Sequence, residues 1–146
     1  MTEETQAKEK PELVFADLTL GREFRALKYP ITKELIQDFM EVVGDHHPLY
    51  THGDPGTALA PPGLAAIYAR SSYLQDHTMP SGGILAKQEF EFLTPIKIGD
   101  TLTVSAKVIE SVQDEKGRKR VTFQIKAVNQ KGVGVCEVTL GAIWPK

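Results

Sequence analysis

The chain has 146 residues, a length that fits one domain with a substantial core. Apolar residues make up 41% of it and charged residues 25%, and the net charge is −2, so nucleic acid and anionic membranes are not expected partners. No apolar run is long enough to span a membrane, and the charged N-terminus is unlike a signal peptide. Because the single Cys136 cannot form an internal disulfide, a cytoplasmic location is predicted.

The N-terminal part of the sequence changes character near residue 13. Residues 1–12 have no apolar period to pack, so they are predicted to be a disordered tail. Residues 13–146 are predicted to form one domain, and a first strand is expected over residues 23–29.

Two helices are predicted next. Apolar residues recur at helical spacing over residues 33–43, with Thr32 as the N-cap and Gly44 at the C-terminal end. A second helix is expected over residues 63–74, after two prolines. It is apolar or small on nearly every side, so it should be buried, and only a sheet wrapped around it could bury so much of it.

The rest of the chain alternates between apolar and polar residues. This period predicts strands over residues 84–93, 102–108, 121–127 and 136–144, joined by short turns. The predicted fold class is therefore α+β, with one antiparallel sheet curled around a central helix.

The segment between the two helices carries most of the residues suited to chemistry. Residues 44–55 contain three of the four histidines, two aspartates and several turn-forming residues. Such a segment is either a solvated loop or a site aimed by the rigid elements beside it. A metal site is not expected, because the adjacent His46 and His47 would point apart on an extended loop.

Three stretches resemble the MaoC-like dehydratases, the family of the R-specific enoyl-CoA hydratases. They are residues 44–50 (GDHHPLY), 60–63 (APPG) and 88–102 (QEFEFLTPIKIGDTL), within a resemblance that covers roughly residues 15–144. The similarity is greatest to the N-terminal-type branch, which includes subunits of bacterial 3-hydroxyacyl dehydratases. The resemblance implies a hot-dog fold.

The resemblance also implies reversible hydration of an enoyl thioester of coenzyme A or of a carrier protein, with the thioester as substrate and no other cofactor. Competent members read Asp-x-Asn-Pro-x-His; the Asp and His act on one water, and a helix Gly N–H holds the thioester oxygen. Here Asp45, Pro48 and Gly63 match that pattern. His47 stands at the Asn position, and Tyr50 stands where the catalytic His is expected.

Tyr50 changes what the site can do, because a phenol is a poor proton acceptor at neutral pH. Either His47 or His52 supplies the missing base, or the chain is a subunit that shapes the acyl tunnel while a His-bearing MaoC-like partner carries the full pair. Tyrosine is common at this position in the N-terminal-type branch, which favours a partner. The candidate residues are therefore Asp45, His47 and Tyr50 for catalysis, and Pro62, Gly63 and His52 for substrate binding.

Other functions and features stay open at this point. A non-catalytic acyl-CoA binding protein is one alternative; a thioesterase ranks last, because the central helix lacks a carboxylate. The basic run 116–120 is predicted to be a solvated hairpin tip, and the alternative is that it binds the phosphates of coenzyme A. Because a hot-dog sheet leaves an edge open, at least a dimer is expected: a homodimer, or a heterodimer or heterotetramer with the His-bearing subunit.

Overall fold

The computed structural model describes residues 10–51 and 58–146. Its elements, in chain order, are η1 (Phe15–Asp17), β1 (Leu27–Pro30), α2 (Lys33–Val43), α3 (Pro48–Thr51), α4 (Leu64–Ser72), β2 (Ile84–Phe92), β3 (Thr101–Gln113), β4 (Lys119–Val128) and β5 (Gly134–Trp144). Among these residues, no helix is long and apolar enough to cross a membrane.

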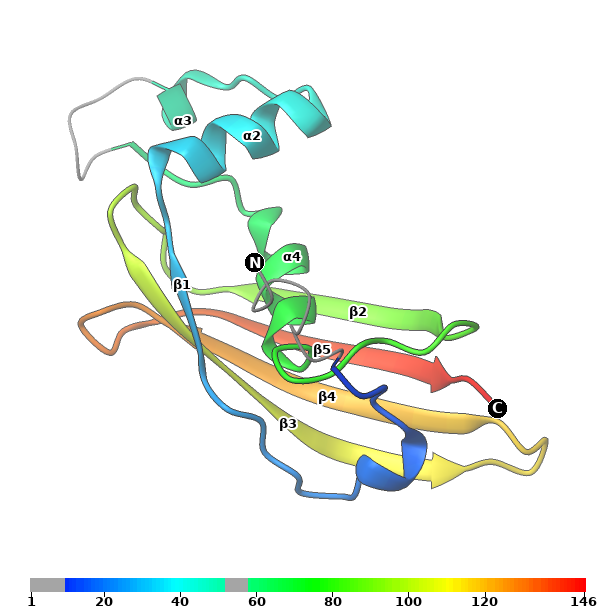
Figure 1. The fold of residues 1–146 in the computed structure, drawn as a ribbon. Helices are drawn as coiled ribbons and strands as arrows, with labels where there is room; N and C mark the ends of the chain where they lie inside the picture. The colour runs from blue at the N-terminus through cyan, green and yellow to red at the C-terminus, as the bar shows by residue number, and fades with distance from the viewer. Residues whose placement is uncertain (1–9, 52–57) are drawn as a thin grey trace, which may run out of the picture.

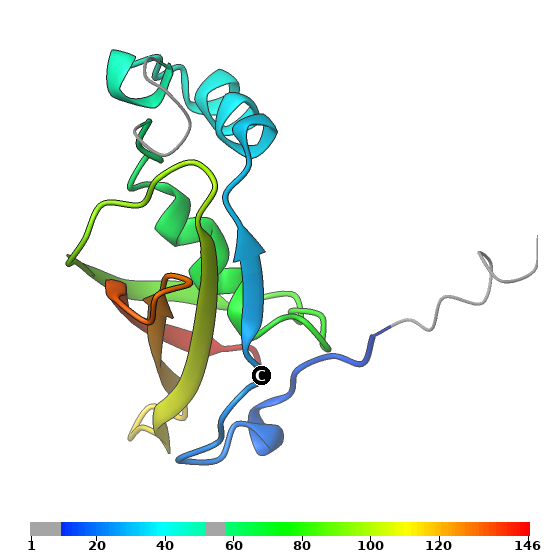
Figure 2. The ribbon, with the colours of Figure 1, turned by 90° about the vertical axis from the view of Figure 1, so that its left-hand side faces the viewer.

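The strands form one antiparallel sheet in the order β1-β3-β4-β5-β2. The sheet curves around α4, while α2 and α3 project beyond its end (Figure 1). Figure 2 shows the same arrangement from the side, with α4 inside the curve. The predicted hot-dog fold is confirmed. We call residues 33–51, which carry α2 and α3, the arm.

The core lies between α4 and the concave face of the sheet. Tyr68 and Ala69 of α4 are buried there, as are alternate residues of β3, β4 and β5. The Phe123 ring stacks on the Tyr73 ring with centroids 4.2 Å apart. The opposite face of α4 is open, with Ile67 45% exposed, so the helix is central as predicted but is buried on one side and not on nearly every side.

Helix α2 begins and ends where the sequence predicts. The Thr32 hydroxyl oxygen accepts a hydrogen bond from the Leu35 N–H at 3.1 Å, which satisfies a free donor of the first turn. Gly44 ends the helix with a φ of 72°, in the left-handed region that glycine adopts at little cost.

The first strand is shorter than predicted. β1 starts at Leu27, and only an isolated bridge between Glu23 and Lys107 precedes it. Between this bridge and β1, the backbone departs from its pairing with β3, because the Arg25 carbonyl accepts a hydrogen bond from the Gln75 side chain. In contrast, β3 continues to Gln113, beyond the predicted end, because a bulge after Val108 shifts the apolar alternation without ending the strand.

The predicted tail is only partly visible, since residues 1–9 lie outside the described residues. At its end, the Thr78 N–H donates to the Pro11 carbonyl, and the Leu13 N–H donates to the Thr78 carbonyl, both at 2.9 Å. The Trp144 indole N–H donates to the Leu13 carbonyl at 2.7 Å. Residues 11–13 are therefore bound to the domain, and the boundary at residue 13 stays a prediction.

Candidate functional site

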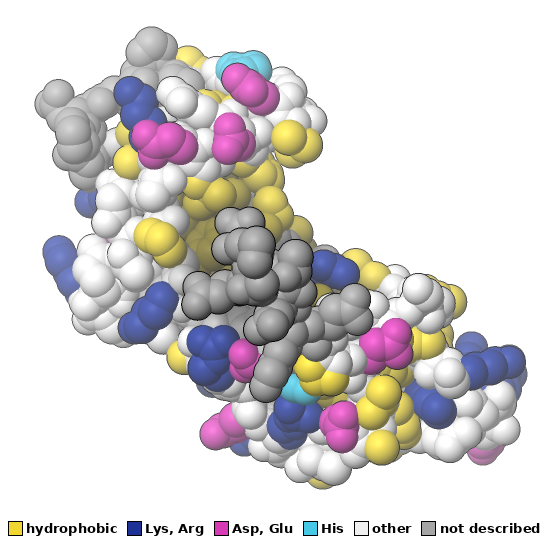
Figure 3. All heavy atoms as spheres, viewed as in Figure 1, with side chains coloured by type: hydrophobic (Ala, Val, Ile, Leu, Met, Phe, Trp, Pro, Cys, Tyr) yellow, Lys and Arg dark blue, Asp and Glu magenta, His cyan; other side chains and the backbone are white. Residues whose placement is uncertain are grey.

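A cavity of about 310 Å³ lies where the arm meets the sheet. Its lining is mostly apolar and comes from α3, the segment before α4, the end of β2, the link from β2 to β3, and β5: Leu49, Tyr50, Leu59, Ala60, Pro62, Phe92, Leu93, Thr94, Pro95, Ile96 and Val135. Figure 3 shows apolar side chains in the hollow between the arm and the sheet. Such a cavity suits a short apolar chain.

Backbone hydrogen bonds hold the walls of this cavity together. The Leu59 N–H donates to the Leu49 carbonyl at 2.9 Å, which ties the segment to the arm. The next residue, Ala60, donates to the Ile96 carbonyl at 2.7 Å, which ties the same segment to the link between β2 and β3. Because adjacent residues bind opposite walls, the segment sets the separation between the arm and the sheet.

Tyr50 is the one predicted catalytic residue that lines the cavity. Its side chain is half-buried and packs against the core. The Tyr50 N–H donates to the His47 carbonyl at 3.0 Å, and the two rings lie with centroids 5.8 Å apart. The phenol is therefore placed to contact whatever occupies the cavity.

Asp45 and His47 are exposed and are not among the described residues that line the cavity. The Asp45 Oδ1 accepts from the His47 N–H at 3.2 Å, and the His47 Nδ1 accepts from the Leu49 N–H at 3.1 Å. Both side chains thus bind free backbone donors at the start of the short helix α3, as capping residues do.

The Leu49 contact engages one of the two ring nitrogens of His47. A ring nitrogen that accepts a hydrogen bond uses its lone pair for that bond, so Nδ1 can take up a proton only after the bond to the Leu49 N–H is broken. In this geometry, His47 acts as a capping residue, and this role competes with a role as a general base.

Gly63 offers a free backbone donor at the start of α4. Pro61 and Pro62 have no N–H, and the Leu64 and Ala65 N–H groups donate to the Pro61 and Pro62 carbonyls at 3.1 and 3.0 Å. The Gly63 N–H is thus left without an acceptor among the described residues. The residue before this donor, Pro62, lines the cavity.

Gly63 also has a packing role. A Cβ at this position would lie 2.9 Å from Cζ of Phe39, on α2. The absence of a side chain therefore lets the arm pack directly on the start of α4, so both readings of this glycine, donor and packing contact, have structural support.

Of the other histidines in the described residues, neither His46 nor His77 lines the cavity. His52 lies outside the described residues. His46 is exposed and His77 is half-buried beyond the end of α4. Within residues 10–51 and 58–146, no cluster of three or more His, Cys, Asp or Glu side chains is arranged to hold a metal ion.

Beneath the site, two buried groups are kept neutral by their surroundings. Burial raises the pKa of the Tyr68 phenol and of the Cys136 thiol. The Tyr68 hydroxyl has no hydrogen-bond partner among the described residues. Both groups belong to the core.

Comparisons with known proteins agree with this architecture. Residues 19–138 match the family described as FAS1-like, dehydratase domain region. A UPF0336 protein of Streptomyces griseus is 29% identical over 111 residues, which cover 66% of this chain and 71% of that protein.

Two solved structures illustrate the likeness in fold. R-hydratase PhaJ1 from Pseudomonas aeruginosa has a TM-score of 0.73 at 23% identity, over 92% of this chain and 87% of that chain. The HadBC complex from Mycobacterium tuberculosis, a 3R-hydroxyacyl-ACP dehydratase, has a TM-score of 0.69 at 20% identity, over 85% of this chain and 96% of that chain. At these identities, the likeness establishes the fold alone.

Proposed function

The chain belongs to the FAS1-like dehydratase domain family, and we propose that it is a subunit of an acyl-thioester hydratase or dehydratase whose partner supplies the complete Asp/His pair. The observation that carries this proposal is the engagement of His47 Nδ1 by the Leu49 N–H. It weakens the case for His47 as a substitute base, while Tyr50 occupies the position where the resemblance implies the catalytic histidine.

The reaction sets clear demands on the site. Hydration bonds the oxygen of water to C3 of the enoyl group and delivers a proton to C2, while negative charge builds on the thioester oxygen. A donor near that oxygen and an acid/base group near the water are both needed. In this chain, the Gly63 N–H and the apolar cavity suit the first demand and the acyl chain, but no described histidine lines the cavity.

Tyr50 can still contribute to the site as a donor. Its hydroxyl can hydrogen-bond to the thioester or to a water held by the partner, although it cannot remove a proton efficiently at neutral pH. We therefore assign Tyr50 to substrate positioning, and Pro62 to the apolar wall of the acyl cavity.

Strand β2 provides a surface for the partner. It pairs with β5 alone among the described strands, so its other edge is open. The side chains of Leu85, Phe90 and Phe92 lie on the concave face, because these residues pair with buried residues of β5. They are nevertheless 59%, 37% and 55% exposed. An open, apolar edge favours pairing with a second hot-dog chain, either a copy of this one or a His-bearing subunit.

The partner also bears on completeness of the site. Phe92 lines the cavity and lies on the open strand, so a chain paired with β2 would stand beside the cavity mouth. The heteromeric HadBC complex, whose chain shares the fold, gives precedent for assembly from two kinds of subunit.

Hydration of crotonyl-CoA tests the proposal. We expect the chain alone to bind the thioester with only background turnover, and Tyr50→His to exceed that background by roughly two decades or more, the usual contribution of an acid/base group. Tyr50→Phe is the matched control, because it keeps the ring and removes only the hydroxyl. Co-purification followed by an assay of the complex would then identify the partner.

The alternatives give different results in the same assay. If the unmodified chain hydrates crotonyl-CoA and Asp45→Asn abolishes turnover, the chain is a self-sufficient homodimeric hydratase, and the subunit proposal is wrong. Thioester binding with no turnover in any assembly would instead identify a non-catalytic acyl-CoA binding protein.

A further inference from the structure

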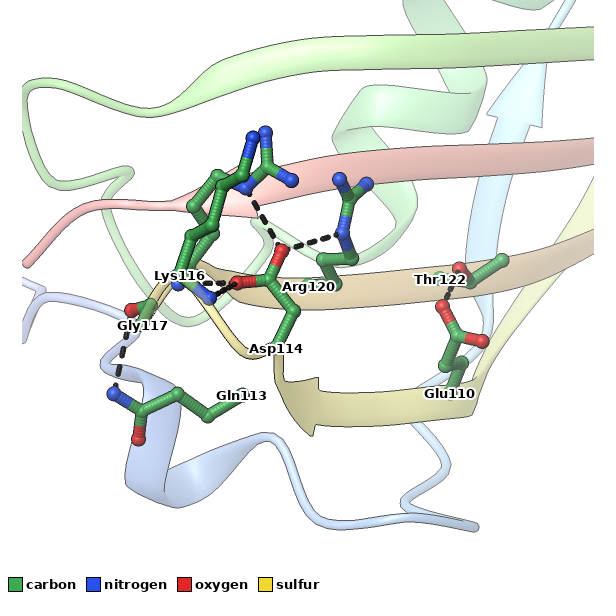
Figure 4. A network of polar contacts seen from close by, with 8 residues as sticks. Glu110, Gln113, Asp114, Lys116, Gly117, Arg120 and Thr122 are labelled. Atoms are coloured by element: carbon green, nitrogen blue, oxygen red, sulfur yellow. Dashed lines mark hydrogen bonds and ion pairs between the residues drawn. The ribbon is translucent and has the colours of Figure 1, made fainter.

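The turn between β3 and β4 contains a carboxylate that binds two arginines at once. The Asp114 Oδ2 accepts from Nε of Arg118 at 2.8 Å and from Nε of Arg120 at 3.0 Å. The Asp114 Oδ1 accepts from the Lys116 and Arg118 backbone N–H groups at 3.0 and 2.8 Å. Figure 4 shows Asp114 between the turn backbone and Arg120, with the terminal nitrogens of Arg120 directed away from the carboxylate.

This geometry leaves the outer part of each guanidinium free. Only the Nε of Arg118 and of Arg120 has an acceptor among the described residues, so the terminal nitrogens of both remain available. The side chains are 43% and 39% exposed. Both arginines are therefore held in place by one anion and can donate to a second one.

A third arginine, Arg25, shows the contrasting arrangement. Arg25 binds Asp76 through two nitrogens, with Nε to Oδ2 at 3.3 Å and Nη2 to Oδ1 at 2.8 Å. The Asp76 carboxylate thus occupies the fork of the Arg25 guanidinium, and it binds this one arginine. At Asp114 one carboxylate serves two arginines, so a positive charge is left over.

The surroundings of the pair keep this excess positive charge. Lys116 and Lys119 add two cations, against Glu115 in the turn and Glu110, which binds the Thr122 hydroxyl at 3.2 Å. Partial burial of Asp114 would raise its pKa, but hydrogen bonds from the Arg118 backbone and from both guanidinium groups outweigh it and lower the pKa to about 2. Asp114 thus stays ionised and keeps the arginines oriented at neutral pH.

We propose that Arg118 and Arg120 form a binding site for a phosphate group, with Asp114 as the residue that positions them. Two planar forks fixed side by side match the several oxygens of a phosphate or diphosphate better than mobile lysines do. The site lies at the β3–β4 turn, at the opposite end of the sheet from the arm (Figure 1).

The proposed function supplies one source of such a group, and this part of the inference rests on it. Coenzyme A carries a diphosphate and a 3′-phosphate, whereas the thioester arm of an acyl carrier carries a single phosphodiester. The paired forks favour phosphate, and free inorganic phosphates share the same chemistry. The phosphate site itself depends only on the geometry of the turn.

Calorimetric titration of the whole chain tests the site without any need for turnover. The probes are inorganic pyrophosphate, adenosine 3′,5′-bisphosphate and phosphate-free pantetheine. We expect the Arg118→Gln/Arg120→Gln variant to bind both phosphate probes about tenfold more weakly or worse, with pantetheine binding unchanged. The Arg118→Lys/Arg120→Lys variant keeps the charge but lacks the forks, so we expect an intermediate affinity.

Arg25→Gln is the matched control, because it removes one exposed arginine whose fork is already occupied. Tighter binding of the adenosine probe than of pyrophosphate would identify the nucleotide end of coenzyme A as the source, and equal affinities would identify simple phosphates. Equal binding by the native chain and the glutamine variant would overturn the site. So would an oligo-glutamate peptide that binds through the arginines while neither phosphate probe does.

Discussion

The arm and the sheet are stabilised in different ways. In β3, β4, β5 and the side of α4 that faces them, the large side chains at inward positions are buried, and Phe123 has no exposed surface. In the arm, by contrast, Val42, Val43 and Leu49 are 86%, 50% and 55% exposed. The residues suited to chemistry therefore lie on the less buried part of the molecule, while the fold depends on the buried core of the sheet and α4.

The arm joins the domain through the inner face of α2, where Ile36 and Met40 are 1% and 4% exposed and belong to the core. Phe39 packs on Gly63, and the segment around Leu59 and Ala60 is hydrogen-bonded to both sides. We therefore expect substitutions in the core to change global stability, those on the outer side of the arm to change local order, and those at the junction to change both.

The largest effect is expected in the sheet. Phe123→Ala removes a fully buried ring that stacks on Tyr73, so we expect the free energy of unfolding to fall by about 3–5 kcal/mol. Urea denaturation would measure it. Val42→Ala is the arm counterpart, and we expect a change within about 0.5 kcal/mol. Similar losses for the two variants would contradict the distinction between arm and sheet.

At the junction, Gly63→Ala should have an intermediate effect. The new methyl group would lie 2.9 Å from the Phe39 ring, and overpacking of this kind costs about 1–3 kcal/mol. We also expect weaker binding of crotonyl-CoA, because relief of the contact with Phe39 would move the start of α4 and, with it, the free Gly63 N–H. The control is the same substitution in a Phe39→Ala background; an undiminished cost there would rule out the contact as its cause.

Within the arm, Asp45→Ala should act locally. It removes one exposed hydrogen bond to the His47 N–H, so we expect a loss of global stability of about 0.5 kcal/mol or less. Hydrogen exchange of the His47 amide should nevertheless become faster. A global loss comparable to that of Phe123→Ala would mean that the arm is part of the cooperative core.

The smallest effect is expected from pH at the β3–β4 turn. Folding lowers the pKa of Asp114 from 3.8 to about 2, so the stabilisation is present above about pH 4 and is lost as the pH falls toward 2. Melting temperatures of the native chain and of Asp114→Asn, measured between pH 5 and pH 2, should converge as the pH falls. A difference that stays constant with pH would show that Asp114 does not titrate in this range.

Much of the fold could be predicted from the sequence because its signals are local. The apolar period, Thr32 and Gly44 define α2 within thirteen residues, and the alternation in β4 and β5 gives the buried face directly. The end of β3 could not be predicted, since the bulge after Val108 depends on pairing with β4.

The site was predictable in composition but not in geometry. The motif around Asp45 and Tyr50 is visible in the sequence, whereas the cavity also needs Phe92, Ile96 and Val135, which only the folded sheet brings to the arm. The use of His47 Nδ1 depends on the direction of one side chain in a short helix, and residue types do not encode it.

The pairing of β2 has a consequence for how the chain folds. Its only partner among the described strands, β5, begins forty-two residues after β2 ends (Phe92 to Gly134) and follows the whole β3–β4 hairpin. Loop closure of this length is slow compared with formation of a hairpin. Until β5 arrives, both edges of β2 are open and Phe90 and Phe92 are uncovered, so partly folded chains are at risk of self-association through this strand. We therefore expect the yield of folded protein to depend on chain concentration during refolding.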